Sequence, residues 1–147
     1  MLHKLNKIVY VENYENDYVY AHPSLIDDLD EILGESGKET DFGKQFRKKI
    51  IFLENLEKNC IQQKSFERLS KHGYLYSLRV MDVHNIRILF AFFALQGREI
   101  VVLLYAFPEK SKSTKNNPKS YSYAIEKAKE RIEELKSVYN DLQLITS

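Results

Sequence analysis

Several residue types that would mark a particular class of protein are scarce in this sequence. It has no tryptophan, five glycines and a single cysteine, Cys60, among 147 residues. One cysteine cannot form an internal disulfide, so a disulfide-stabilised fold is excluded and a reducing compartment is favoured. No apolar run approaches the ~18 residues that span a bilayer, and the first residues lack the apolar stretch of a signal peptide. We therefore expect a cytoplasmic protein without a membrane segment.

Motifs of the common metal, nucleotide and hydrolase sites are also absent. The four histidines have no metal-ligand spacing, and the sequence contains no G-x-x-x-x-G-K-[ST], G-x-G-x-x-G or G-x-S-x-G motif. Cys60 falls on the apolar stripe of a predicted helix, which is more typical of a core residue than of a ligand. We expect neither a metal ion nor a cofactor.

Positive and negative charges are unevenly distributed along the chain, although the formal net charge is only +1. Residues 1–41 carry three lysines against ten acidic residues, whereas residues 42–119 carry fifteen basic residues against six acidic ones. A basic middle segment suggests a surface for a polyanion. An uneven but purely solvated surface is the alternative.

The pattern of apolar residues predicts one α+β domain over residues 1–147. Capping residues and apolar stripes at spacings of three and four predict helices over 24–33, 41–60 and 118–142. Alternating β-branched and aromatic stretches predict strands over 7–14, 17–21, 74–80, 85–93 and 99–107. Short connections join the last three strands, so we expect an antiparallel meander with two helices before it and one after it.

Two arginines lie inside predicted neighbouring strands of this meander. Arg79 is in the first strand, and Arg87 lies between Ile86 and Ile88 in the second. A strand arginine requires a wet face or a partner, and the acids available nearby are Asp82, Glu99 and Glu109. Clustered cations with few partners suggest a missing anion, and phosphate fits because arginine binds it through a planar fork.

The third strand ends in a lysine-rich segment that could extend this basic cluster. Lys110 and Lys112 follow the strand directly, and Tyr76 and Phe107 lie near the same cations in the sequence. Unstacked RNA bases bind to such aromatic rings. The alternative for each aromatic residue is a position in the core, which is the more common role.

The stretch "FERLSKHGYLYSLRV…NIRILFAFF…GREIVVLLYAFPEKSKST…AIEKAKERIEEL", residues 66–135, resembles the RelE/ParE superfamily of bacterial toxins. The HigB-like branch, which includes phage-derived proteins, is the most similar. Its L-x-x-G-L-x-E-L-R element corresponds to "LSKHGYLYSLR", its Y-R-[IV]-L-[YF] strand to "IRILF", and its F-x-K-K-[ST] strand end to "FPEKS". The resemblance covers about half of the chain and implies a RelE-like fold.

The resemblance also implies a function: the toxin of a type II toxin–antitoxin pair, an endoribonuclease that cuts messenger RNA on the ribosome. In this reaction the substrate 2′-OH attacks the adjacent phosphate. By position, Arg87 would hold the scissile phosphate, Arg79 would stabilise charge or assist deprotonation, and Lys110 would serve the leaving oxygen. RNA-binding positions would be Lys71, His72, Tyr76, Phe107 and Lys112.

Two departures from the family pattern leave alternatives open. Glu109 stands where the family often has a lysine, and the insertion "TKNNP" moves Pro118 away from the strand end. A ParE-like toxin that poisons gyrase by protein contact is one alternative, and an inactive RNA-binding relative is another. The expected partners are messenger RNA on the ribosome and a HigA-like helix-turn-helix antitoxin, and a homodimer is a further alternative.

Overall fold

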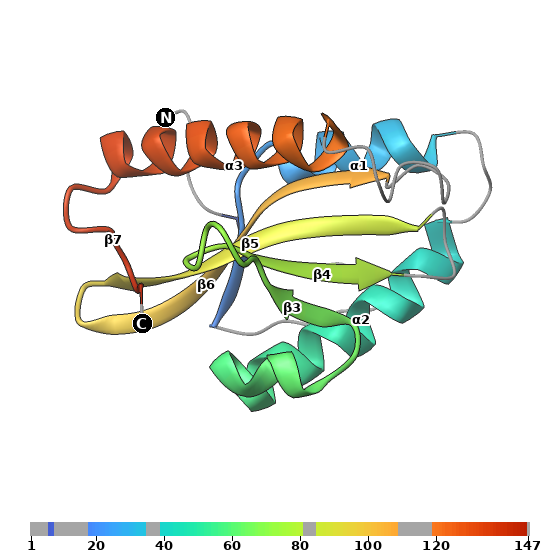
Figure 1. The fold of residues 1–147 in the computed structure, drawn as a ribbon, viewed down its shortest axis with the longest axis horizontal. Coiled ribbons are helices and arrows are strands. Elements are labelled where there is room, and N and C mark those ends of the chain that lie inside the picture. The colour runs from blue at the N-terminus through green and yellow to red at the C-terminus, as the bar shows by residue number, and fades with distance from the viewer. Residues whose placement is uncertain (1–5, 8–17, 35–38, 81–84, 109–118, 147) are drawn as a thin grey trace.

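The computed structural model describes residues 6–7, 18–34, 39–80, 85–108 and 119–146. The elements, in chain order, are β1 (Asn6–Lys7), β2 (Val19–Ala21), α1 (Leu25–Leu33), α2 (Glu39–Leu56), the 3-10 helix η1 (Glu57–Gln62), β3 (Phe66–Arg68), β4 (Tyr76–Val80), β5 (Ile86–Leu95), β6 (Arg98–Pro108), α3 (Lys119–Val138) and β7 (Gln143–Leu144). The expected α+β class is confirmed, with two α-helices before the long strands and one after them (Figure 1).

The strands of the described residues form one sheet in the order β1-β2-β6-β5-β4-β3, with β7 pairing to the far end of β5. The antiparallel meander of β4, β5 and β6 is as predicted. The prediction of an entirely antiparallel sheet is wrong, because β2 pairs with β6 in parallel, from Val19 opposite Val101 to Ala21 opposite Leu103. The two helices and three strands between β2 and β6 provide the long connection that a parallel pair needs.

The two faces of the sheet bury different residues and are covered by different helices. The even-numbered residues of β5, such as Ile88 and Phe90, pack with apolar residues of α1 and α2. Leu89, Ala91 and Phe93 lie on the other face and pack with apolar residues of α3. Figure 1 shows α2 and α3 on opposite sides of the strands. The alternation of β-strand side chains thus divides the protein into two cores.

The helices before the meander form where their apolar stripes predict them. In α1, Leu25, Leu29 and Leu33 recur every four residues and are buried. Ser24 is at the N-cap position, but its side chain makes no capping hydrogen bond, so the capping residue that the sequence predicts here does not cap the helix. The second helix was expected to reach Cys60. Its α-helical part ends at Leu56, because Glu57 has a φ of 51°, outside the right-handed helical region.

Candidate functional site

Arg79 and Arg87 are direct partners in the β4–β5 ladder. Residues that face one another in an antiparallel pair project from the same side of the sheet, so both arginines lie on the face that carries α3. Phe107 is the partner of Arg87 on β6 and is buried in the α3 core, which confirms the face. The predicted pairing of the two arginine strands is therefore confirmed.

The two arginines line a small cavity of about 100 Å³ at the β3–β4 side of this face. Its lining residues are Lys64, Ser65, Phe66, Glu67, Ser77, Arg79 and Arg87. A water molecule occupies about 30 Å³ in the liquid, so the cavity has room for a group the size of a phosphate but not for a base and sugar as well. Among the described residues of this lining, three basic side chains against one carboxylate give an excess of positive charge, which favours an anion.

Arg87 is held between a carboxylate and an aromatic ring. Its side chain is 13% exposed, and its Nη1 atom lies 3.7 Å from Oε1 of Glu67, a contact longer than a hydrogen bond. The guanidinium carbon also lies 5.9 Å from the centre of the Tyr121 ring, within the range of a cation–π contact. These contacts orient a largely desolvated guanidinium toward the cavity.

Arg79 is positioned by its backbone, and part of its guanidinium is left unsatisfied. Its backbone N–H donates to the carbonyl oxygen of Ser65 at 2.8 Å, which ties β4 to the residue preceding β3. The Nε atom is buried and has no hydrogen-bond partner within the ranges that the structure describes. A buried donor without an acceptor is costly. An anion oxygen in the cavity would supply the acceptor.

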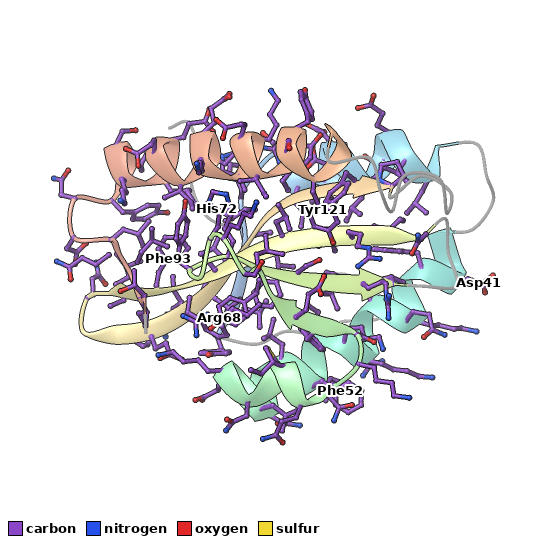
Figure 2. All side chains as sticks on the ribbon, in the orientation of Figure 1. Asp41, Phe52, Arg68, His72, Phe93 and Tyr121 are labelled. Atoms are coloured by element: carbon purple, nitrogen blue, oxygen red, sulfur yellow. The ribbon has the colours of Figure 1, made fainter. Side chains whose placement is uncertain are left out.

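Tyr121, near the start of α3, contacts two residues of the cavity lining, Ser77 and Arg87. Its hydroxyl lies 3.3 Å from Oγ of Ser77, and its ring packs edge-on against Phe107 at 5.2 Å between centroids. In Figure 2, Tyr121 projects from α3 toward the strands. The sequence pattern predicts the helix that carries Tyr121, but gives no sign that this residue would reach the two arginines.

Glu67 was also missed, because β3 is only three residues long and resembles a linker in the sequence. The acids expected near the arginines were Asp82, Glu99 and Glu109. Glu99 instead accepts a hydrogen bond from the hydroxyl of Tyr18 at 2.7 Å, and the other two lie outside the described residues. Glu67 reaches the site because it pairs with Ser77 across the β3–β4 ladder.

Lys71 and His72 lie beside the arginine cavity, in a separate hollow. This hollow has a volume of about 280 Å³ and is lined by Leu69, Ser70, Lys71, His72, Tyr121, Ser122 and Ile125. Figure 2 shows His72 and Tyr121 between α3 and the strands. The two expected RNA-binding residues are thus separated from the arginines by Tyr121, which lines the hollow and contacts Arg87.

The structure does not place Tyr76 or Phe107 where a base could stack on it. Tyr76 is 6% exposed and lies on the opposite face of the sheet, stacked on Phe90 at 5.5 Å. Phe107 is on the arginine face but is equally buried, stacked on Tyr105 at 6.2 Å. Both are core residues, so the expectation that they stack on RNA bases is corrected.

Lys110 and Lys112, the predicted site residues after β6, fall outside the described residues. Their roles remain those implied by the family resemblance.

Cys60 is fully buried, and burial raises the pKa of its thiol from 9.0 to about 12. It is therefore a core residue and not a nucleophile at neutral pH.

In the described ranges, no three histidine, cysteine or acidic residues gather as a metal site. None of the helices there has the length and apolar content that crossing a membrane requires.

A scan against models of known protein families gives no match, and searches of curated proteins and of solved structures give none either. The resemblance to the RelE/ParE superfamily therefore depends on the sequence elements quoted above.

Proposed function

We propose that this chain is a HigB-like toxin of the RelE/ParE superfamily, an endoribonuclease that cuts messenger RNA on the ribosome. The observation that carries the proposal is the direct pairing of Arg79 with Arg87 in the lining of a cavity of about 100 Å³. Like charges directly opposite in a sheet destabilise the fold. Their presence is explained if the cavity binds a phosphodiester group.

The reaction needs no cofactor, because the substrate supplies the nucleophile. The 2′-oxygen forms a bond to phosphorus while the bond from phosphorus to the 5′-oxygen breaks. The 2′-OH gives up its proton to a base, and the departing 5′-oxygen gains one from an acid, leaving a 2′,3′-cyclic phosphate and a 5′-hydroxyl. The phosphate gains a second negative charge in the transition state. A preorganised cavity with excess positive charge stabilises that state more than the ground state.

Three charged groups of the cavity lining have roles in this reaction. Arg87 holds the scissile phosphate, and Arg79 donates to the oxygen on which charge develops. Glu67 is the carboxylate of the cavity lining and is 57% exposed, so it is accessible to accept the proton of the 2′-OH. Lys110, by family resemblance, serves the leaving 5′-oxygen.

Expression in bacterial cells tests the proposal. The wild-type chain should stop translation rapidly and leave cleaved transcripts, and Arg87→Ala should do neither. Arg98→Ala is the matched control, because Arg98 is an exposed arginine on β6 that donates to the hydroxyl of Tyr20 at 2.9 Å and does not line the cavity. It should retain toxicity.

The same experiment separates the alternatives. DNA breaks and an SOS response with intact transcripts would favour a ParE-like gyrase poison. RNA binding without cleavage would favour an inactive relative. The proposal includes a HigA-like helix-turn-helix antitoxin as partner, so co-expression of a short neighbouring reading frame with that pattern should abolish toxicity.

A further inference from the structure

The hollow beside the arginine cavity has the size and lining of a site for a single nucleobase. Its volume of about 280 Å³ is just below the ~300 Å³ at which pockets for drug-sized ligands begin. It lies between the β3–β4 connection and the first turns of α3. We propose that it binds the base of a nucleotide whose phosphate lies in the arginine cavity, and that it prefers guanine. This inference extends the proposed function to a substrate preference.

Tyr121 connects the hollow to the arginine cavity. Its ring forms part of the hollow, lies 5.9 Å from the guanidinium carbon of Arg87, and has its hydroxyl 3.3 Å from Ser77 in the cavity lining. A group bound in the hollow would therefore lie next to a group bound in the arginine cavity, with the Tyr121 ring between them. The base and the phosphate of a single nucleotide are neighbours of this kind.

The walls and rim of the hollow match the two parts of a base. Leu69, Tyr121 and Ile125 are partly buried and provide apolar and aromatic surface for the faces of a ring. Ser70, Lys71 and Ser122 are exposed polar residues of the same lining. Lysine donates to the O6 and N7 acceptors of guanine, whereas adenine presents an amino donor beside N7. This difference is the basis of the preference for guanine.

The connection that carries Lys71 and His72 is fixed by hydrogen bonds. The N–H of Leu75 donates to the carbonyl of His72 at 2.8 Å, and the N–H of Leu69 donates to the carbonyl of Leu75 at 3.0 Å. Arg68 holds the same segment from outside, with Nε donating to the carbonyl of Gly73 at 2.6 Å. A Cβ on residue 73 would lie 3.3 Å from Nη2 of Arg68, so a glycine suits this close approach. The hollow is thus preformed.

Titration with three small probes, followed by amide NMR spectra, tests the inference. The probes are guanosine 3′-phosphate, adenosine 3′-phosphate and ribose phosphate. In the wild type, guanosine 3′-phosphate should shift the signals of residues 69–72 and 121–125. It should bind about tenfold more tightly than ribose phosphate, because stacking of one base contributes roughly 1–3 kcal/mol and 1.4 kcal/mol is tenfold.

Variants distinguish the base site from the phosphate site. Lys71→Ala should remove the preference for guanosine over adenosine and leave ribose phosphate binding unchanged. Lys48→Ala, an exposed lysine on α2, is the control and should change nothing. Arg87→Ala should weaken all three probes equally.

One result would rule out the base site alone, and another would rule out the phosphate site alone. If guanosine 3′-phosphate bound no better than ribose phosphate and left residues 69–72 unshifted, the base site would be wrong, even if Arg87→Ala still weakened binding. If guanosine 3′-phosphate bound in the hollow but Arg87→Ala had no effect, the phosphate site, and with it the proposed function, would fail instead.

Discussion

Arg79 and Arg87 face one another across the β4–β5 ladder and line the same cavity. Two guanidinium groups in this relationship repel each other, and among the described residues of the cavity lining the only carboxylate is that of Glu67, at the edge of the sheet. We expect a protein to retain such a pair where an anion is part of its working state.

Replacing Arg79 should stabilise the fold while impairing activity. Arg79→Met keeps much of the side-chain length and removes one of the two opposed charges. Cross-strand pairs contribute roughly 0.2–1 kcal/mol, so the free energy of unfolding in urea should increase by up to about 1 kcal/mol. A substantial loss of stability in this variant would show that Arg79 holds the fold together and is not kept for binding.

A phosphate-like anion should stabilise the wild-type protein by binding only to its folded state. Sulfate should raise the melting temperature more than chloride does at equal ionic strength. The excess should be smaller in Arg87→Ala, where only the general stabilising effect of sulfate remains, and should persist in full in the control Arg98→Ala. An equal response of all three proteins to sulfate would indicate a general salt effect and no site.

The ring and the hydroxyl of Tyr121 should have separable effects. Tyr121→Phe removes the contact with Ser77 and should lower the free energy of unfolding by about 1 kcal/mol, the usual contribution of one hydrogen bond, with little effect on RNA cleavage. Tyr121→Ala also removes the surface that contacts Arg87 and should reduce cleavage much more. Cleavage rates of the two variants, measured at a temperature where both are folded, provide the comparison.

The ion pair between Asp28 and Arg131 should anchor α1 to α3. Nη1 and Nη2 of Arg131 donate to the two carboxylate oxygens of Asp28 at 2.6 and 3.0 Å, and both side chains are largely buried. Removing one member of such a pair leaves an uncompensated charge, so Arg131→Met should destabilise the protein by about 3 kcal/mol or more in urea. Lys127→Ala, which breaks an exposed pair with Glu130, should change stability by less than about 1 kcal/mol.

Alkaline pH should destabilise the protein through Cys60. The folded thiol keeps its proton up to a pKa of about 12, whereas the unfolded thiol loses its proton near 9.0. Between these values the unfolded state binds fewer protons, so the free energy of unfolding falls as pH rises, by at most about 1.4 kcal/mol per pH unit for one group. Burial also raises the pKa of Tyr18, which adds to the effect at higher pH.

Denaturation curves from pH 8 to 11 would measure this effect. Cys60→Ala should have a shallower decline of stability than the wild type above pH 9. Parallel declines in the two proteins would contradict the assignment of this effect to the thiol.

The long elements of the fold could be predicted from the sequence because their patterns are long. β4, β5, β6 and the three α-helices all coincide with predicted elements to within a few residues. β3 and β7 have three and two residues, too few for an alternating pattern to be recognised. The parallel pairing of β2 with β6 could not be predicted either, because it joins segments far apart in the chain and leaves no local signal.

The candidate site was only partly predictable for the same reason. The proximity of Arg79 and Arg87 could be predicted, because the connection between their two strands is short enough for a hairpin. Glu67 and Tyr121 join them through β3 and α3, whose positions depend on tertiary packing. Tyr76 and Phe107 were misplaced because a buried aromatic and a base-stacking aromatic look alike in a sequence. The β5–β6 ladder also has an irregular register between Leu89 and Phe90. This irregularity changes which β6 residues project from each face of the sheet before Phe107.

Single-turnover cleavage of messenger RNA on purified ribosomes tests the central claim most directly. We expect fragments ending in a 2′,3′-cyclic phosphate, and losses in rate of about 10²–10³-fold for Arg79→Ala and Arg87→Ala, with Arg98→Ala unchanged. Cleavage at the wild-type rate by folded Arg87→Ala, or no cleavage by the wild type, would contradict it.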